Sequence, residues 1–215
     1  MTVPDERIEV QRHGDRGEYD RRAIYAILDE ALYCTVAFVH DGHPVAIPTI
    51  HVRVGDQLVL HGSPASRMLR TLKAGARASI AVTLLDGLVL ARSVFNHSMN
   101  YRSVVLFGIA EEIADSVEKL VAMRVFTEKI LPGRWDDVRQ PSEKEFKGTL
   151  MLRIPIEAAS AKIRSGPPVD EDEDYGLPVW AGVIPLHITP GPPIPAPELD
   201  RGILYPEYLR HRYPE

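Results

Sequence analysis

The stretch YCTVAFVHDGHPVAIPTIHVRVGDQLVLH, residues 33–61, contains three strand-like runs separated by two turn signals. The first two runs are rich in Val, Ile and Thr and flank His40-Asp41-Gly42-His43, which is typical of a hairpin turn. Gly55-Asp56 is the second turn signal. Successive hairpins of this kind predict an antiparallel sheet, because parallel strands need long crossover connections.

The second hairpin also predicts where two histidines lie. If Gly55-Asp56 forms a two-residue loop, His51 faces Leu60 and Ile50 faces His61. His51 and His61 then point to opposite faces of the sheet. Cys34 lies in the first run and is expected to be a buried strand residue, since no positive neighbour is evident to lower its pKa.

Outside this stretch, apolar spacing predicts two or three helices among further strands. A helix is expected over residues 21–32, and a short one from Ser63 (N-cap) and Pro64 to Gly75, with Met68, Leu69 and Leu72 inward. A second amphipathic helix is expected over residues 116–130, with an apolar side formed by Val117, Leu120, Val121, Val125 and Ile130. The remaining strands are expected at residues 77–85, 101–113, 149–156 and 161–164.

The fold class that follows is mainly β, a small and partly open antiparallel barrel with flanking helices. Neither Gly-x-Gly-x-x-Gly nor Gly-x-x-x-x-Gly-Lys occurs, which excludes the common dinucleotide and P-loop motifs. We expect an N-terminal extension over residues 1–20 and a barrel domain over 21–165. Residues 166–215, rich in proline and acidic residues, are expected to pack on the barrel or on a partner subunit.

Composition excludes several classes of protein. The 215-residue chain is 45% hydrophobic with a net charge of −5, so it can bury a core but lacks the basic stripe of nucleic-acid-binding proteins. Asp86 interrupts the best apolar run, and the charged N-terminus resembles no signal peptide, so we expect a cytoplasmic protein without a membrane span. One cysteine allows no intramolecular disulfide. His40 and His43 are expected to be solvent-exposed turn residues, and no metal site is predicted.

The segment His61-Gly62-Ser63-Pro64-Ala65-Ser66-Arg67-Met68-Leu69-Arg70 combines features of an anion site. A strand leads directly into a helix start, where free N–H groups favour a negative ligand. Ser63 and Ser66 add hydroxyl donors, Gly62 permits close approach, and Arg67 or Arg70 can donate charge-assisted hydrogen bonds. The alternative is a capped helix with exposed arginines.

A second polar segment precedes residue 108. Arg102, between Tyr101 and Ser103, can reach either a phosphate or a neighbouring carboxylate. Gly108 inside a strand indicates a bulge or a close backbone approach.

Five blocks of sequence together resemble the pyridoxamine 5'-phosphate oxidase-like family of FMN-binding split barrels. The resemblance covers about residues 21–186 and is closest to the branch of flavin-nucleotide-binding and nitroimidazole-resistance proteins. The blocks are LHGS (60–63) with Ser66-Arg67, DGLVLARS (86–93), NYRSVVLFG (100–108), PGRW (132–135) and VWAGVIPL (179–186).

This resemblance implies a homodimer of six-stranded split barrels, with FMN at the subunit interface and both subunits contributing to each site. By position, Ser66 and Arg67 would hold the FMN phosphate, with His61, Gly62 and Ser63 lining its approach. The other residues implied are Pro48, Thr49 and Ile50 at the polar edge of the flavin ring, Arg102 and Ser103, and Trp180 near the flavin or the dimer seam.

The sequence departs from pyridoxamine phosphate oxidases themselves. Met68 stands where those enzymes have a lysine, and their Arg-x-His signature is absent, so that substrate is not expected. The leading hypothesis is an FMN-dependent oxidoreductase acting on a small molecule, with His61 as the candidate catalytic residue. The alternatives are a non-catalytic flavin-binding or storage protein, and a haem-binding split barrel with His61, His51 or His97 as axial ligand.

Overall fold

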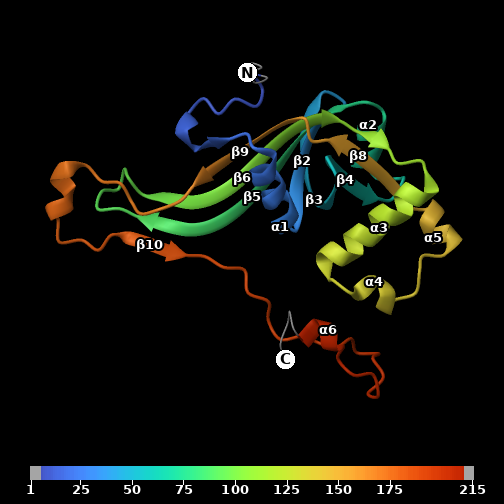
Figure 1. Ribbon diagram of the computed structural model, residues 1–215. Coiled ribbons are helices and arrows are strands. Elements are labelled where there is room, and N and C mark those ends of the chain that lie inside the picture. The colour runs from blue at the N-terminus through green and yellow to red at the C-terminus, as the bar shows by residue number, and fades with distance from the viewer. Residues whose placement is uncertain (1–5, 211–215) are drawn as a thin grey trace.

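Ten antiparallel strands form one sheet in the computed structural model, which describes residues 6–210 (Figure 1). The strands are β1 (Gly17–Glu18), β2 (Tyr33–His40), β3 (His43–Val54), β4 (Gln57–Gly62), β5 (Arg77–Leu90), β6 (Ser98–Ile109), β7 (Glu111–Glu112), β8 (Leu150–Pro155), β9 (Ala158–Arg164) and β10 (Gly182–Pro185). The helices are α1 (Arg21–Glu30), α2 (Arg67–Lys73), α3 (Ser116–Ile130), α4 (Arg134–Asp137), α5 (Glu143–Lys147) and α6 (Glu207–Arg210), with 3-10 turns at Gly14–Arg16 and Asp172–Gly176.

The strand order shows that the sheet curls back on itself. It runs β1-β9-β6-β5-β2-β3-β4-β8-β7, with β10 paired to β5. Only Ala110 separates β6 from β7, although β7 lies at the far end of this order. The sheet must therefore bend until that end approaches β6. The expectation of a mainly β, antiparallel fold is confirmed, whereas the sheet has ten strands where six were expected, and its strand order stays open.

Gly108 lies where the curled sheet closes most tightly. A Cβ atom at this position would lie 2.5 Å from Ile154 Cγ2 on β8, far inside van der Waals contact. The β6–β5 register passes through Gly108 without a bulge, so the close approach expected at this glycine is confirmed.

The double hairpin of residues 33–61 has the predicted register. Val54 pairs with Gln57 and His51 with Leu60, so the turn between β3 and β4 is a two-residue loop. His51 Nε2 lies 2.9 Å from the Leu28 carbonyl oxygen of α1, whereas the His61 ring packs against Phe126 of α3. The two histidines therefore do point to opposite faces. Cys34 is buried as expected, and burial raises the pKa of its thiol to about 12.

The main core lies between the inner face of the curled sheet and helices α1 and α2. Met68, Leu69 and Leu72 face it as predicted, and Gly75 follows the helix with φ +93°. The predicted start of α2 at Ser63 was wrong, because the helix begins at Arg67 with Ser66 as its N-cap. The Ser63 carbonyl instead accepts the Ser66 N–H at 2.9 Å, which forms a separate turn before the helix.

Helix α3 covers a smaller second core with a face that the spacing did not predict. Ala122 and Phe126 are its buried residues, packed near Val52, Val59 and Met151. Of the apolar side expected to face inward, only Val125 packs on this core. The others are 43–71% exposed: Val117, Leu120, Val121 and Ile130. Apolar residues surround this helix, so spacing alone did not decide which face is buried.

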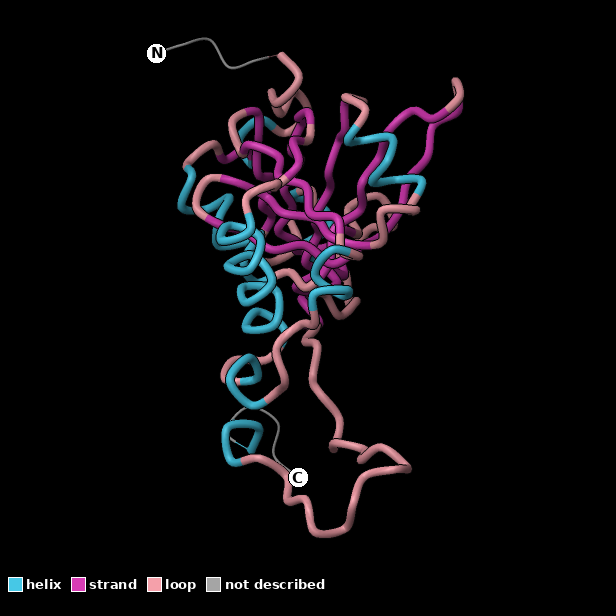
Figure 2. Tube along the Cα trace, turned by 90° about the vertical axis from the view of Figure 1, so that its right-hand side faces the viewer, coloured by secondary structure: helices cyan, strands magenta, loops and turns pink. Residues whose placement is uncertain are grey.

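Both chain extensions contribute strands and contacts to the barrel domain. β1 pairs with β9, and β10 pairs with the outer part of β5. Beyond β10 the chain leaves the sheet as an extended arm and returns to α4 through α6 (Figures 1 and 2). Tyr208 fastens this return, since its hydroxyl donates to Asp137 at 2.7 Å and accepts from Arg134 at 3.0 Å. Among residues 6–210, no helix combines the length and hydropathy needed to cross a bilayer.

Candidate functional site

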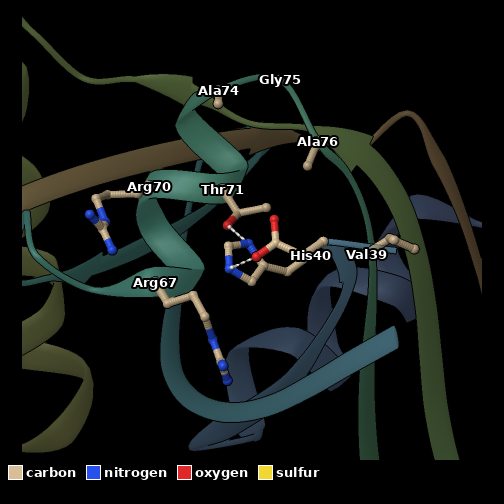
Figure 3. Close-up of a pocket in the computed structure, with 9 residues that line it drawn as sticks. Val39, His40, Arg67, Arg70, Thr71, Ala74, Gly75 and Ala76 are labelled. Carbon is tan, nitrogen blue, oxygen red and sulfur yellow. Dashed lines mark hydrogen bonds and ion pairs between the residues drawn. The ribbon is translucent and has the colours of Figure 1, made fainter. Parts of the chain in front are cut away.

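An open groove of about 660 Å³ lies between helix α2 and the turn that joins β2 to β3 (Figure 3). Arg67, Arg70 and Thr71 line it from the helix, and His40 and Asp41 line it from the turn. Figure 3 shows Arg67 extending from α2 on the side of His40, whereas Arg70 points the other way. The groove therefore brings Arg67, a residue singled out from the sequence, together with His40, which was not.

Neither arginine is neutralised by a neighbour. Within residues 6–210, no carboxylate forms an ion pair with Arg67 or Arg70, whereas Arg53, Arg92 and Arg102 each have one. Helix α2 has only seven residues, so the positive potential of the groove comes mainly from these guanidinium groups. An exposed guanidinium without a carboxylate partner is available for an anionic ligand.

The serines near Arg67 retain donor capacity. Ser66 Oγ accepts the Leu69 N–H at 3.5 Å, and Ser63 Oγ accepts the Ala65 N–H at 3.2 Å. Each hydroxyl has accepted a hydrogen bond and still has its own proton to donate. Packing also favours glycine at position 62, because a Cβ atom there would lie 3.1 Å from Leu69 Cδ1.

His40, on the turn side of the groove, contacts Thr71 on the helix side. Thr71 Oγ1 lies 2.9 Å from His40 Nδ1, and His40 Nε2 lies 3.3 Å from Asp41 Oδ2. A neutral imidazole protonated at Nε2 satisfies both contacts, accepting from Thr71 and donating to Asp41. The expectation that His40 is a solvent-exposed turn residue was therefore wrong, while His43 is exposed as expected. The contact joins residues 31 positions apart, and no local sequence signal marks it.

The segment Pro48-Thr49-Ile50 lies on a strand with one unpaired edge. β3 pairs with β2 from His43 to Ile50, but with β4 only from His51 to Val54. β4 itself continues to Gly62. The backbone groups of Thr49 and Ile50 on β3 therefore form no ladder hydrogen bonds with the facing end of β4. That end consists of His61 and Gly62, just before the chain turns into α2.

Arg102 and Ser103 are not brought to this groove. The Arg102 guanidinium donates to Asp86 at 2.8 and 2.9 Å and to Glu30 at 2.8 Å, with a further short contact to Glu30. These bonds to Asp86 and Glu30 raise the pKa of Arg102, and they hold the pKa values of both carboxyl groups low. Ser103 Oγ donates to the Lys162 carbonyl at 3.2 Å within the sheet. Of the two roles left open for Arg102, the ion pair is the one observed.

Trp180 lies on the other side of the protomer from α2. It precedes β10, which Figure 1 shows far from α2. Its side chain is 66% exposed, and its ring would lie 3.0 Å from a Cβ atom at Gly182. Trp180 therefore packs over β10 and does not line the groove of its own chain.

His61 is a half-buried base whose ring has no polar partner in the described chain. Its Nδ1 is buried without a hydrogen bond, its ring centroid lies 4.2 Å from that of Phe126, and burial lowers its pKa. His51 is fully enclosed, and burial lowers its pKa to about 4. His97 is exposed, with Nδ1 2.7 Å from the Ser93 carbonyl. His61 is the member of this trio that is both shielded and unpartnered.

Comparison with known proteins identifies the family. The family described as pyridoxamine 5'-phosphate oxidase matches residues 20–163. The flavocytochrome Anf3 from Azotobacter vinelandii is 38% identical, with a TM-score of 0.91 and coverage of 97% of both chains. An FAD- and haem-binding protein from Mycobacterium smegmatis is 42% identical, with a TM-score of 0.87, coverage of 91% of this chain and 96% of that one.

A nitroimidazole antibiotic resistance protein from Bacteroides thetaiotaomicron shares the fold, at 22% identity and a TM-score of 0.58 over 68% of this chain and 86% of that one. No curated protein sequence matches the chain. The family match spans most of the curled sheet that carries the groove, and it agrees with the resemblance found from the sequence. The chain therefore belongs to the pyridoxamine 5'-phosphate oxidase-like family.

Proposed function

We propose that the protein binds a flavin nucleotide, with its phosphate at Arg67 and Ser66 and the polar edge of its ring at the unpaired edge of β3. The observation that carries this proposal is the Arg67 guanidinium, which lies at the groove without a carboxylate partner. A phosphate there would receive charge-assisted hydrogen bonds, each worth roughly 1.5–3 kcal/mol. The Ser66 hydroxyl proton and the backbone groups of Thr49 and Ile50 supply the remaining polar contacts.

FMN is the smallest ligand that fits these requirements, since it carries a ring and a single phosphate. One relative is named as an FAD-binding protein, and FAD contains the same FMN portion with a second phosphate. Arg70 and His40 extend the polar surface beyond Arg67. FMN is therefore our proposed ligand, and FAD is the alternative that a direct competition distinguishes.

A bound flavin supplies hydride or electron transfer, which makes the protein an oxidoreductase acting on a small molecule. The chain's own residues bind and orient the ligand: Arg67 fixes the phosphate, and the edge of β3 fixes the ring. His61 follows on the adjacent strand, and its lowered pKa keeps the imidazole neutral near pH 7. A neutral imidazole can accept a proton at Nε2 and, once protonated, return it, so His61 is the proposed catalytic residue.

We also propose that the protein is a homodimer. The outer face of β2, β3, β5 and β6 is uncharged at its centre and uncovered, as the register from Val105 through Ala81 and Thr35 to Pro48 shows. Its large apolar side chains are 36–60% exposed: Tyr33, Val39, Ile50, Leu85 and Val105. A self-complementary apolar face of this kind suits a two-fold interface.

In such a dimer, the segments that leave the barrel can reach the second copy. Ile188 and Ile194 on the extended arm are 90% and 91% exposed, and Trp180 is largely exposed beside it. Trp180 cannot serve its own groove, so a role near the flavin would require the partner's groove.

Haem binding is the second candidate function. Two relatives with 38% and 42% identity are named as a flavocytochrome and an FAD- and haem-binding protein. His61 fits an axial ligand best, because its ring is shielded by Phe126 and has no hydrogen-bond partner within residues 6–210. His51 is bound to Leu28 inside the core, so it is closed to a ligand of that size.

Titration of the apoprotein with FMN, FAD and riboflavin tests the proposal. We expect FMN to bind at least tenfold more tightly than riboflavin, which lacks the phosphate, as measured by quenching of flavin fluorescence. Equal affinities would contradict the phosphate site at Arg67. The same preparation titrated with haem tests the second function: a Soret band that shifts in His61→Ala but not in His97→Ala would support ligation by His61.

A further inference from the structure

Lys129 near the C-terminal end of α3 lines a second groove, on a different part of the surface from the one at α2. This groove has a volume of about 400 Å³ and lies between α1, β3 and α3. The half-buried Val125 gives it an apolar floor, with the fully buried Val52 behind it. Its charged lining consists of three cations and two carboxylates: Arg53, Arg124, Lys129, Asp29 and Glu128. Neither Arg67, proposed for the flavin phosphate, nor His61, proposed for the haem iron, lines it.

The cations in this groove are paired with carboxylates, with one exception. Arg53 donates to both oxygens of Asp29, at 2.9 and 2.5 Å, and Arg124 lies 3.5 Å from Asp136. Glu128 accepts the backbone N–H groups of Gly133 and Trp135. Within residues 6–210, no carboxylate lies within 4 Å of the Lys129 ammonium, so its charge is left without an ion-pair partner.

The partners of Lys129 are neutral. Its Nζ donates to the Leu28 carbonyl at 2.9 Å, one of the free carbonyls at the end of α1, and lies 3.4 Å from His51 Nε2. The Leu28 oxygen has two lone pairs and can accept from both Lys129 and His51. An ammonium has three N–H donors, so at least one remains for the groove.

We propose that this groove binds a carboxylate carried on an apolar frame, with Lys129 as its counterion and the half-buried Val125 as its apolar floor. The ligand would neutralise the one cation of the groove that lacks a carboxylate partner and cover the exposed part of Val125. A neutral ligand would leave the ammonium as it is, and a small hydrophilic anion would leave Val125 uncovered. The structure thus favours an anion with an apolar body over either.

Protonation of Lys129 then sets the pH range of binding. Burial lowers the pKa of Lys129 to about 8. The other titratable or charged groups around it are Cys34 on β2, His51 and Arg53 on β3, Asp29 on α1, and Arg124 and Glu128 on α3. The thiol, with a pKa of about 12, and the His51 ring, with a pKa of about 4, stay neutral from pH 6 to 9. Affinity should therefore fall about tenfold per pH unit above the pKa of Lys129.

Calorimetry with hexanoate as the probe tests this inference. We expect hexanoate to bind at pH 7, acetate to bind more weakly, and hexanamide, its neutral isostere, not to bind measurably. Lys129→Gln keeps a donor for the Leu28 carbonyl but removes the charge, and should weaken hexanoate binding at least tenfold. Arg67→Glu should leave hexanoate binding unchanged, because Arg67 does not line this groove. A failure of the flavin site would therefore be measured independently of hexanoate binding.

Three results would overturn the proposal: no binding of hexanoate to the wild-type protein, equal binding of hexanoate and hexanamide, or no loss of affinity between pH 7 and pH 9. The last two use only the wild-type protein, so they hold even if Lys129→Gln fails to fold. The carboxylate can also be a haem propionate. Retention of haem but not of haem dimethyl ester would identify that source, whereas equal retention of both would leave a free acid as the ligand.

Discussion

His51 links the buried interior to the stability of the protein at acid pH. Its side chain is fully buried on β3, and burial, followed by the Lys129 charge, lowers its pKa from 6.5 to about 4. Its Nδ1 is buried without a partner, so a proton there would gain no hydrogen bond. The folded protein therefore resists protonation of a group that the unfolded chain protonates readily.

This difference predicts a loss of stability as the pH falls from 6.5 towards 4. Because the unfolded state binds the proton more tightly, the free energy of unfolding should decrease by about 2 kcal/mol between neutral pH and pH 5. Urea denaturation at the two pH values measures this. In His51→Gln the decrease should be much smaller, and an unchanged decrease would assign it to other groups.

A second prediction for a single residue concerns Gly108. Because its Cβ position lies 2.5 Å from Ile154 Cγ2, Gly108→Ala should lower the free energy of unfolding by about 1–3 kcal/mol through overpacking. Gly14→Ala is the matched control, since nothing lies within 4 Å of that Cβ position. Combining Gly108→Ala with Ile154→Ala should give a cost smaller than the sum of the two single changes. Strict additivity would show that the two strands do not press together here.

At the scale of elements, one ion pair holds the segment that leads into β10. Asp170 accepts the Arg92 backbone N–H at 2.8 Å and its guanidinium at 2.9 Å, and its carboxylate is enclosed. Arg92 also lies over the Tyr175 ring, 5.2 Å from its centroid. Arg92 follows β5, so these contacts fasten the loop of residues 166–176 to the end of the long β5–β6 hairpin.

We predict that Asp170→Asn loosens this segment without unfolding the barrel. The amide would leave Arg92 without its counterion, so backbone amides of residues 169–185 should exchange with deuterium faster than in the wild-type protein. Hydrogen exchange read by mass spectrometry measures this. Asp172→Asn, in the same loop but without a described partner, should have no effect. Equal exchange in both variants would remove the structural role given to Asp170.

The elements also show what local sequence signals could predict. The hairpins at residues 40–43 and 55–56 followed from their turn residues, and the inward face of α2 followed from apolar spacing at Met68, Leu69 and Leu72. The buried face of α3 could not be predicted in this way. It depends on Ala122 and Phe126 meeting side chains of β3, β4 and β8, and those contacts exist only once the sheet has curled.

Only part of the candidate site could be predicted, again because some of its contacts exist only in the folded chain. Arg67, Ser66 and Ser63 are adjacent in sequence and remain together in the structure. His40 reaches the groove through its contact with Thr71, which joins two elements distant in sequence. The ion pairs of Arg102 could not be predicted, because its two carboxylates, Asp86 and Glu30, come from other elements. A sequence motif does not indicate which charged residues the fold brings together.

At the scale of the whole molecule, the uncovered face of β2, β3, β5 and β6 predicts the oligomeric state. Light scattering should give about twice the 24.0 kDa mass of the chain. Val105→Asp, at the centre of this face, should shift the protein towards the monomer, because it would bury a charge without a partner. Val117→Asp on α3 is the control, since Val117 is 71% exposed and lies off this face. A monomeric wild-type protein would contradict the dimer and the sharing of sites between subunits.

The proposed function requires the groove at α2 to hold a flavin phosphate, so the decisive measurement is flavin retention by the wild-type protein and by Arg67→Glu. Each protein would be loaded with FMN, separated from free ligand and examined by visible absorption, with Arg22→Glu on α1 as a control for charge reversal alone. We expect a flavin double band in the wild type and in Arg22→Glu, and its loss in Arg67→Glu. An undiminished flavin band in Arg67→Glu would show that Arg67 does not hold the flavin phosphate.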